Sequence, residues 1–238
     1  MVDQRFPIRP EVTAAVSTSG LHAVLFDMDG TLVDSEKVWD LGLRELARCY
    51  GGQLSETARA RMVGTSMIES MHILHTDIAQ PWRDIEASVA WLESRVAELF
   101  RDGLPWRPGA RELLAEVRAA GIATGLVTAT GRALVTLALG TIGAHNFDVV
   151  VCGDEVEATK PHPQPYLTAA ALLGTEPGRC VAIEDSPTGM ASAVAAGCVV
   201  VAVPCEVALA ETAGVIVVPS LATLSVADLR TLVGQAQP

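Results

Sequence analysis

The sequence predicts an α/β fold, in which a parallel sheet flanked by helices is interrupted, just after its first strand, by a helical insertion. Short apolar runs of strand length alternate with segments of helical spacing, which is typical of βαβ units and a doubly wound core. Residues 35–106 depart from this alternation and show largely helical spacing. The expected strands are Ala23–Phe26, Ala123–Val127, Asp148–Cys152, Cys180–Glu184, Val199–Val203 and Val215–Val218.

The first expected strand is a continuous apolar run, as in a strand that is buried on both faces of a sheet. In the insertion, helical spacing predicts that one face of the first helix is formed by Val38, Leu41, Leu46 and Cys49. Turn residues at Pro105–Gly109 end the insertion. We expect the core of the insertion to contain the tryptophans Trp39, Trp82, Trp91 and Trp106.

Composition and charge exclude several classes of protein. Half of the 238 residues are hydrophobic, which is enough for a substantial core, and the longest apolar runs are far shorter than the roughly 20 residues that span a membrane. The net charge of -11 disfavours nucleic acid and anionic membranes as partners, because both attract basic surfaces. Residues 1–20 have no continuous apolar segment, which predicts a disordered leader instead of a secretory signal.

The five cysteines form no Cys-x-x-Cys pair, and their number is odd. Several lie in apolar runs, where free thiols pack as small hydrophobic groups. This pattern favours a reducing compartment over a disulfide framework, so we expect a cytoplasmic protein, which we take to be a monomer.

Two carboxylates directly follow the first expected strand. Asp27 and Asp29 lie where this strand leaves the sheet, and open α/β sheets bind ligands at the carboxyl ends of their strands. Two ionised carboxylates about 4 Å apart repel by roughly 4 kcal/mol at an effective dielectric constant of 20, so the pair predicts a cation or a shared proton. The alternative is structural, with one Asp capping a helix and the other forming a turn.

Two later strand ends carry candidate phosphate contacts. The segment Thr128-Ala129-Thr130-Gly131 offers hydroxyls and backbone amides ahead of a helix, which favours an anion. Lys160 is one of two lysines in a chain with fifteen arginines, so a compact point charge is favoured at this position. Each segment also has a structural interpretation, as a helix cap or as a surface charge.

Glu184 is the last residue of the expected strand Cys180–Glu184, and Asp185 follows it directly. With Asp27 and Asp29 they would complete an oxygen-rich pocket, and Mg²⁺ prefers few carboxylates, several waters and a substrate phosphate. Zinc is disfavoured because these strand ends lack a cluster of His and Cys. The alternative is that the two acids only begin a helix.

Together, these motifs resemble those of haloacid dehalogenase-superfamily phosphohydrolases, and they occur in the order Asp27-x-Asp29-Gly30-Thr31, Thr128, Lys160 and Glu184-Asp185. The resemblance extends from about His22 to the end of the chain. It implies a Rossmann-like three-layer core with a parallel sheet and an α-helical cap domain inserted after the first strand. The implied division is a disordered leader at 1–20, a core at 21–34 and 107–238, and a helical cap at 35–106.

The resemblance also implies a role for each motif. Asp27 is the expected nucleophile that forms an aspartyl-phosphate, and Asp29 is the expected general acid and base. Mg²⁺ is expected at the Asp27 carboxylate, the Asp29 backbone carbonyl and Asp185, with Glu184 as a further or water-mediated ligand. The expected contacts of a small phosphorylated substrate are Thr128, Ala129 and Lys160 in the core and Trp39 and Gly64 in the cap.

Several stretches resemble sugar and polyol phosphate phosphatases of the 2-deoxyglucose-6-phosphate type, namely Phe26–Gly30, Asp34–Glu36, Trp39-Asp40 and Lys160–Gln164. We therefore predict an Mg²⁺-dependent phosphatase, with a mutase of the β-phosphoglucomutase type as the alternative. The mutase pattern has basic residues and a His at the positions of Val63, Met67 and Trp39, so hydrolysis is favoured. Arg59 or Arg61 can compensate for these departures.

Two other reactions and one non-catalytic function are disfavoured. Dehalogenation does not use a second Asp, whereas Asp29 is present. Phosphonate hydrolysis needs a lysine in the cap, and the insertion offers only Lys37 near its start. A non-catalytic sensor with a decayed fold would be expected to lose the nucleophile or its acid, and both are retained.

Overall fold

The computed structural model describes residues 20–62, 65, 67–205, 209 and 212–236. The predicted leader lies outside this part of the chain, except for Gly20. The described residues form two compact units. The core unit contains the residues up to Val33, Trp106–Val135 and those from Ile142 onward, and the helical unit contains Asp34–Pro105 and Thr136–Thr141. The predicted limits of the core and cap domains stay a prediction.

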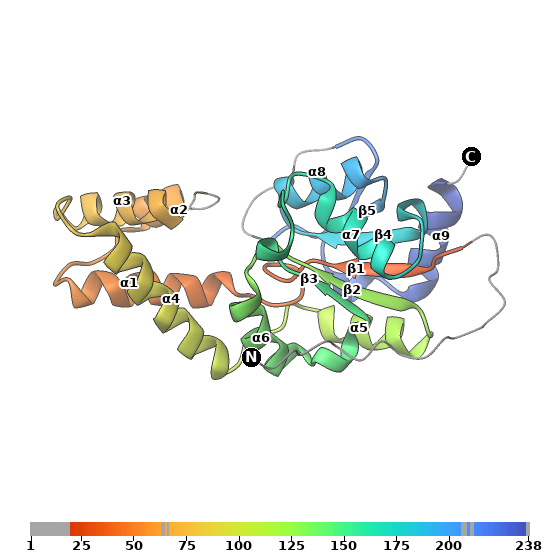
Figure 1. The fold of residues 1–238 in the computed structure, drawn as a ribbon, viewed down its shortest axis with the longest axis horizontal. Helices are drawn as coiled ribbons and strands as arrows, with labels where there is room; N and C mark the ends of the chain where they lie inside the picture. The colour runs from red at the N-terminus through yellow and green to blue at the C-terminus, as the bar shows by residue number, and fades with distance from the viewer. Residues whose placement is uncertain (1–19, 63–64, 66, 206–208, 210–211, 237–238) are drawn as a thin grey trace. The chain divides into compact units, whose positions relative to one another are not determined.

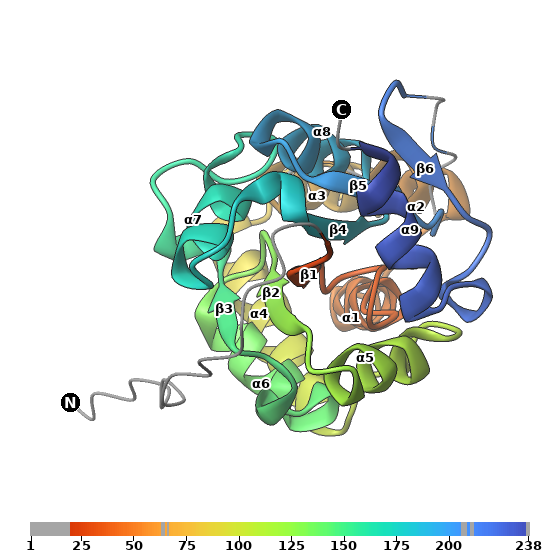
Figure 2. The ribbon, with the colours of Figure 1, turned by 90° about the vertical axis from the view of Figure 1, so that its right-hand side faces the viewer.

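A parallel sheet of six strands lies at the centre of the core unit (Figures 1 and 2). The strand order is β3-β2-β1-β4-β5-β6, and the predicted α/β fold is confirmed. The central strands β1, β2 and β4 have the predicted limits, whereas β3, β5 and β6 each end one residue earlier than predicted, and β3 also begins one residue later. The strands span Ala23–Phe26 (β1), Ala123–Val127 (β2), Val149–Val151 (β3), Cys180–Glu184 (β4), Val199–Ala202 (β5) and Val215–Val217 (β6).

Helices cover both faces of the sheet, so the core unit has three layers (Figure 2). On one face, α7 (Gln164–Leu172) and α8 (Pro187–Ala196) pack against each other and against the strands. On the other face lie α5 (Ala110–Ala119) and α9 (Val226–Ala236), and α6 (Arg132–Ile142) follows β2. The connections include 3₁₀ turns at Ala144–Asn146, Gly153–Glu155, Pro177–Arg179 and Leu221–Thr223.

The register of the sheet aligns the ends of its three central strands. Phe26, the last residue of β1, pairs with Leu126 of β2 and with Ile183 of β4. Parallel pairing therefore places Asp27 beside Glu184 and beside the last residue of β2. The carboxyl ends of these strands meet at one edge of the sheet, where open α/β folds bind ligands.

Four described helices make up most of the helical unit (Figure 1). Helices α1 and α3 both pack against α4, and α2 packs against α3. Their limits are Glu36–Cys49 (α1), Glu56–Met62 (α2), Met67–Asp77 (α3) and Ile85–Arg101 (α4).

The predicted apolar face of α1 is wrong at two positions. Leu41 is 41% exposed and Cys49 is also exposed. The buried side of α1 is centred on Gly42, where a Cβ atom would lie 2.8 Å from Leu92 Cδ1 of α4. Val38 and Leu46 are buried, as predicted. The buried side also includes Gly42, which has no side chain to reveal its contact with α4, so the spacing of large apolar residues locates this side only in part.

The expectation that all four tryptophans lie in a core is wrong for Trp82, whose side chain is 76% exposed. Trp82 follows Pro81 in the turn between α3 and α4, and neither helix covers it. Trp39 and Trp91 are half-buried in the helical unit, whereas Trp106 belongs to the core unit, so the expectation is also wrong for Trp106.

All five cysteines have free thiols. Burial raises the pKa of the Cys152, Cys180 and Cys198 thiols to about 12, so these three are not nucleophiles at neutral pH. Among the described residues, no helix combines the length and the apolar character that crossing a membrane requires.

Candidate active site

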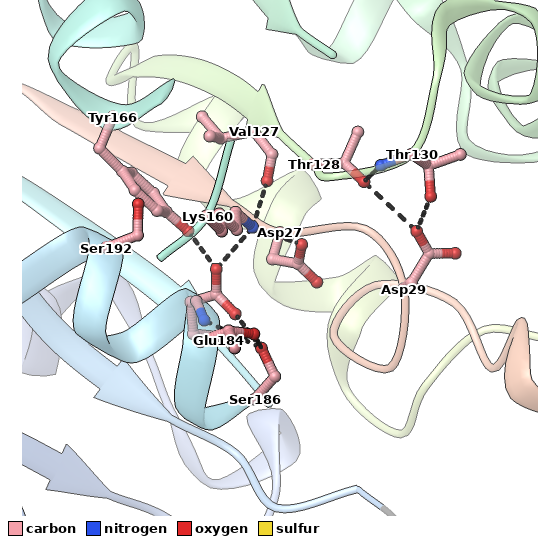
Figure 3. A network of polar contacts seen from close by, with 12 residues as sticks. Asp27, Asp29, Val127, Thr128, Thr130, Lys160, Tyr166, Glu184, Ser186 and Ser192 are labelled. Atoms are coloured by element: carbon pink, nitrogen blue, oxygen red, sulfur yellow. Dashed lines mark hydrogen bonds and ion pairs between the residues drawn. The ribbon is translucent and has the colours of Figure 1, made fainter. Parts of the chain in front are cut away.

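Lys160 joins the ends of three strands by hydrogen bonds (Figure 3). Its ammonium group donates to Asp27 Oδ1 at 2.7 Å, to Glu184 Oε1 at 2.6 Å and to the Val127 carbonyl at 2.8 Å. These acceptors use all three of its protons. The side chain is 4% exposed, so water screens these charges weakly.

Asp27 is buried among other acidic groups. Its pKa is raised to about 7, mainly because of burial and also because of the Glu184 and Asp29 carboxylates, while Lys160 opposes the rise. Asp27 Oδ1 accepts the bond from Lys160, whereas Oδ2 is buried and has no hydrogen-bond partner within the described part of the chain. An unsatisfied buried acceptor is unfavourable, so Oδ2 is the atom that a cation or a substrate can satisfy.

Asp29 lies apart from the lysine network and faces the loop after β2 (Figure 3). Thr130 Oγ1 donates to Asp29 Oδ2 at 2.6 Å, and Thr128 Oγ1 donates to the same atom at 3.3 Å. The Thr130 N–H donates to Thr128 Oγ1 at 3.0 Å, which fixes the loop. The two hydroxyls therefore orient the Asp29 carboxylate. Thr130 is a site residue that the sequence analysis did not assign, although it lies in the loop that was predicted to bind an anion.

Within the described residues, Asp27, Glu184 and Asp185 form a group that can hold a metal ion, because their ligand atoms lie within 4.8 Å of one another. Burial and the charges of Asp27 and Glu184 raise the pKa of Asp185. All of these ligand atoms are carboxylate oxygens, which Mg²⁺ prefers. Asp27 Oδ2, which has no hydrogen-bond partner among the described residues, is suited to bind the metal. The Asp29 side chain is not in this group, and its contact through the backbone carbonyl stays a prediction.

Gly30 makes room for the carboxylate of Asp185. Its φ is +78°, and a Cβ atom at this position would lie 1.9 Å from Asp185 Oδ2. Only glycine permits both the backbone conformation and the close approach.

Glu184 is held by a partner that the sequence analysis did not identify. The Tyr166 hydroxyl donates to Glu184 Oε1 at 2.5 Å, and both side chains are fully buried. Ser186 Oγ lies 3.4 Å from Glu184 Oε2. Tyr166 is on α7, in the same Pro-rich stretch as Lys160. Its position in the sequence, six residues after a candidate catalytic lysine, could have identified Tyr166 as a site residue.

The structure divides the predicted substrate contacts between the two units. Thr128 is buried at the end of β2, and Ala129 is exposed in the next loop. Trp39 lies on α1 of the helical unit, whereas Gly64 lies outside the described residues. The residues brought together at one edge of the sheet are Asp27, Asp29, Thr128, Lys160, Glu184 and Asp185.

Known proteins are similar to this chain in sequence. The family described as haloacid dehalogenase-like hydrolases matches residues 24–203. Hexitol phosphatase B of Escherichia coli (strain K12) is 31% identical over 216 residues, which cover 89% of this chain and 96% of that protein. The phosphorylated carbohydrates phosphatase of Thermotoga maritima is 33% identical over 182 residues, which cover 74% of this chain and 82% of that protein.

A solved structure shows the same fold. CbbY from Rhodobacter sphaeroides, in complex with phosphate, superposes with a TM-score of 0.73 at 29% identity and covers 88% of this chain and 99% of its own. The family match spans more than half of the chain and includes the strand ends that carry the candidate site. The chain therefore belongs to the haloacid dehalogenase-like hydrolase family, as its motifs predict.

Proposed function

We propose that this phosphoric monoester hydrolase removes phosphate from a sugar or polyol phosphate, with Mg²⁺, through an aspartyl-phosphate on Asp27. One observation carries the proposal: the buried Asp27 carboxylate has one oxygen paired with Lys160 and one oxygen with no partner among the described residues. The named relatives, hexitol phosphatase B and phosphorylated carbohydrates phosphatase, support the substrate class.

In the first step, an Asp27 oxygen attacks the phosphorus, and the bond between phosphorus and the sugar or polyol oxygen breaks. The leaving oxygen takes a proton from Asp29, whose carboxyl group is oriented by two threonine hydroxyls. Lys160 offsets the negative charge of Asp27, which weakens the repulsion between this carboxylate and the incoming phosphate.

In the second step, the ionised Asp29 accepts a proton from water, and the water oxygen attacks the phosphorus of the phosphorylated Asp27. The bond between phosphorus and Asp27 breaks, so inorganic phosphate leaves and both aspartates return to their starting states. Asp29 therefore alternates between acid and base within one turnover.

The metal would be held by Asp27, Asp185 and the Asp29 backbone carbonyl. When bound, Mg²⁺ neutralises negative charge on these carboxylates and on the transferred phosphoryl group. Burial, together with the neighbouring carboxylates, raises the pKa of both Asp27 and Asp185, and a bound cation would stabilise their ionised forms, which is consistent with this assignment. Glu184 Oε1 is already engaged by Lys160 and Tyr166, which favours a water-mediated contact for Glu184.

A phosphate-release screen tests the proposal. Purified protein with Mg²⁺ is assayed against sugar, polyol, nucleotide and glycolytic phosphates, and sugar or polyol phosphates are expected to give the highest kcat/KM. Asp27→Asn is expected to abolish turnover, while Asp102→Asn, which changes an exposed carboxyl in the helical unit, should retain it. Undiminished turnover in Asp27→Asn would exclude Asp27 as the nucleophile.

Hydrolysis has to be distinguished from phosphosugar mutase activity. The protein is incubated with β-glucose 1-phosphate and a bisphosphate activator, and both glucose 6-phosphate and free phosphate are measured. We expect phosphate release to be the faster reaction. Faster formation of glucose 6-phosphate would show a mutase.

A further inference from the structure

Two threonine hydroxyls meet at one oxygen of Asp29, and the two contacts differ in strength (Figure 3). Thr130 Oγ1 lies 2.6 Å from Asp29 Oδ2, within the range of about 2.5–2.7 Å for a hydroxyl that donates to an ionised carboxylate. Thr128 Oγ1 lies 3.3 Å from the same oxygen, which is beyond the usual range of about 2.5–3.0 Å for hydroxyl hydrogen bonds. Of the two hydroxyls, that of Thr130 therefore holds Asp29 more strongly.

The backbone of Thr130 is fixed on both sides. Its N–H donates to Thr128 Oγ1 at 3.0 Å, and its carbonyl accepts a bond from the Gly153 N–H at 3.1 Å. Gly153 fits against this loop because it has no side chain, since a Cβ atom there would lie 2.0 Å from the Ala129 carbonyl oxygen. The core unit itself therefore sets the position from which the Thr130 hydroxyl reaches Asp29.

The contacts at Oδ2 determine which oxygen of Asp29 carries its proton. Each carboxyl oxygen has about two lone-pair sites, and the two threonine hydroxyls donate to those of Oδ2. In the protonated acid, the oxygen that accepts from both hydroxyls is the carbonyl oxygen, so the proton belongs on Oδ1. The same contacts remain possible after the proton has left, because an ionised carboxylate also accepts at Oδ2.

Substrate binding would change the roles of the two threonines. Thr128 is an expected contact of the phosphoryl group, and its single hydroxyl proton cannot serve the phosphoryl group and Asp29 at the same time. The longer bond from Thr128 is therefore the one exchanged for substrate. Thr130 then keeps the shorter bond to Asp29 and preserves the orientation of the carboxyl group.

We propose that Thr130 is a positioning residue for proton transfer. Its hydroxyl holds Asp29 Oδ2 through both steps, so that Oδ1 gives its proton to the leaving oxygen and then takes a proton from the attacking water. The inference rests on the proposed function, in which Asp29 is the acid and the base. Thr130 acts through Asp29 and does not contact the phosphorus or the leaving group.

The test compares two aryl phosphates of similar shape, phenyl phosphate and p-nitrophenyl phosphate. Phenolate is the more basic leaving group and depends on an acid, whereas p-nitrophenolate is stabilised by its nitro group and leaves without one. The quantity measured is kcat/KM, with the full chain and Mg²⁺. It reports the steps up to phosphorylation of Asp27 and does not depend on how fast the second step is.

Thr130→Val removes the hydroxyl and keeps the shape of the side chain. General acid catalysis contributes about 10²–10⁴-fold, so a misplaced acid is expected to lower kcat/KM for phenyl phosphate about 10- to 100-fold. For p-nitrophenyl phosphate, kcat/KM is expected to fall less than about threefold. Thr130→Ser keeps the hydroxyl and should retain the wild-type ratio of the two values. Thr130→Ala makes the same test if the valine variant does not fold.

Thr231→Val is the matched control, because the Thr231 hydroxyl donates to the Ala227 carbonyl at 2.9 Å on an exposed side of α9. Its ratio of the two kcat/KM values should equal that of wild type, and melting temperatures identify the folded variants. Equal losses for both substrates in Thr130→Val would overturn the inference, because a distorted loop or a lost phosphoryl contact slows both reactions alike. Wild-type activity of folded Thr130→Val toward phenyl phosphate would also overturn it.

Activity of the wild-type protein separates failure of the inference from failure of the proposed function. Hydrolysis of both aryl phosphates by wild type, without a selective loss in Thr130→Val, overturns the inference and leaves the phosphatase activity intact. If wild type hydrolyses neither aryl phosphate nor acetyl phosphate, the proposed function fails, and the inference fails with it.

Discussion

Replacing Tyr166 with Phe removes a single hydroxyl and tests how the charges of the active site are held in place. This hydroxyl donates to Glu184 Oε1 at 2.5 Å, and both residues are fully buried. A hydrogen bond to a charged group contributes about 1.5–3 kcal/mol to stability. Because about 1 kcal/mol shifts the melting temperature of a chain of this size by roughly 2–4 °C, a loss of about 2 kcal/mol lowers Tm by about 4–8 °C.

The same change is expected to reduce activity, because Glu184 and Lys160 share the hydrogen-bond network that Tyr166 supports. Loss of such a supporting partner next to a metal site costs about 10- to 100-fold in activity or metal affinity. The assays are Tm in EDTA, which excludes effects of bound metal, and kcat for p-nitrophenyl phosphate over a range of Mg²⁺ concentrations.

Tyr50→Phe is the matched control, since Tyr50 is the other tyrosine of the chain. Its hydroxyl lies 2.8 Å from Ser88 Oγ in the helical unit. The control is expected to alter stability but not the Mg²⁺ dependence of turnover. A folded Tyr166→Phe protein with the kcat and the Mg²⁺ dependence of wild type would refute the role assigned to Tyr166.

Three further predictions follow from single residues. Gly30→Ala would place a Cβ atom 1.9 Å from Asp185 Oδ2 at a φ of +78°, so Mg²⁺ affinity should fall about tenfold or more in isothermal titration calorimetry. Asp29→Asn cannot take a proton from water, so mass spectrometry of an acid-quenched reaction with p-nitrophenyl phosphate should detect phosphorylated Asp27. Burial lowers the pKa of His75 below its ordinary value of 6.5. The neutral imidazole therefore contributes stability above pH 6.5 that is lost as the pH falls through the lowered pKa, and Tm should decrease more on acidification in wild type than in His75→Asn.

Each of these predictions has an outcome that contradicts it. Gly121→Ala is a control for Gly30→Ala, because Gly121 has a φ of +71° and its Cβ position has no neighbour within 4 Å. If both variants bind Mg²⁺ as wild type does, the contact with Asp185 is unimportant. Unmodified Asp27 in the quenched Asp29→Asn reaction would argue against the second step. Parallel Tm curves for wild type and His75→Asn would show that His75 does not titrate in this range.

The geometry around His75 explains why protonation should be unfavourable. Ser88 Oγ donates its proton to the Asp84 carbonyl at 2.8 Å, so it accepts from His75 Nε2 at 2.9 Å. The neutral tautomer with a proton on Nε2 satisfies this bond. His75 Nδ1 is buried with no hydrogen-bond partner in the described part of the chain, and a proton there would have no acceptor.

The fold was predictable where the pattern of apolar residues is continuous. The limits of β1, β2 and β4 were predicted correctly because these central strands are buried on nearly every side. Val203 and Val218, which follow β5 and β6, still donate backbone bonds to neighbouring strands, so the difference lies in how a strand end is assigned. The buried face of α1 was predicted only in part: Val38 and Leu46 are buried, but the contact of Gly42 with α4 was not predictable, because Gly42 has no side chain to reveal it.

The candidate site was predictable in its charged residues but not in the partners that hold them. Asp27 and Glu184 stand at strand ends, where a charge after an apolar run is visible in the sequence, and Lys160 is visible because the chain has only two lysines. The bond between Thr130 and Asp29 joins residues that are 101 positions apart. Only the register of the parallel strands brings such pairs together.

The saturation of Lys160 determines how a substrate can enter the site. All three ammonium protons have acceptors, so a phosphoryl oxygen has to replace one of them. The bonds to Asp27 and Glu184 are also ion pairs, whereas the Val127 carbonyl has no net charge and holds the ammonium group less strongly. The bond to Val127 is therefore the one most readily exchanged for substrate. Lys160 can then contact the phosphoryl group while its ion pairs still hold Asp27, the proposed nucleophile, against Glu184.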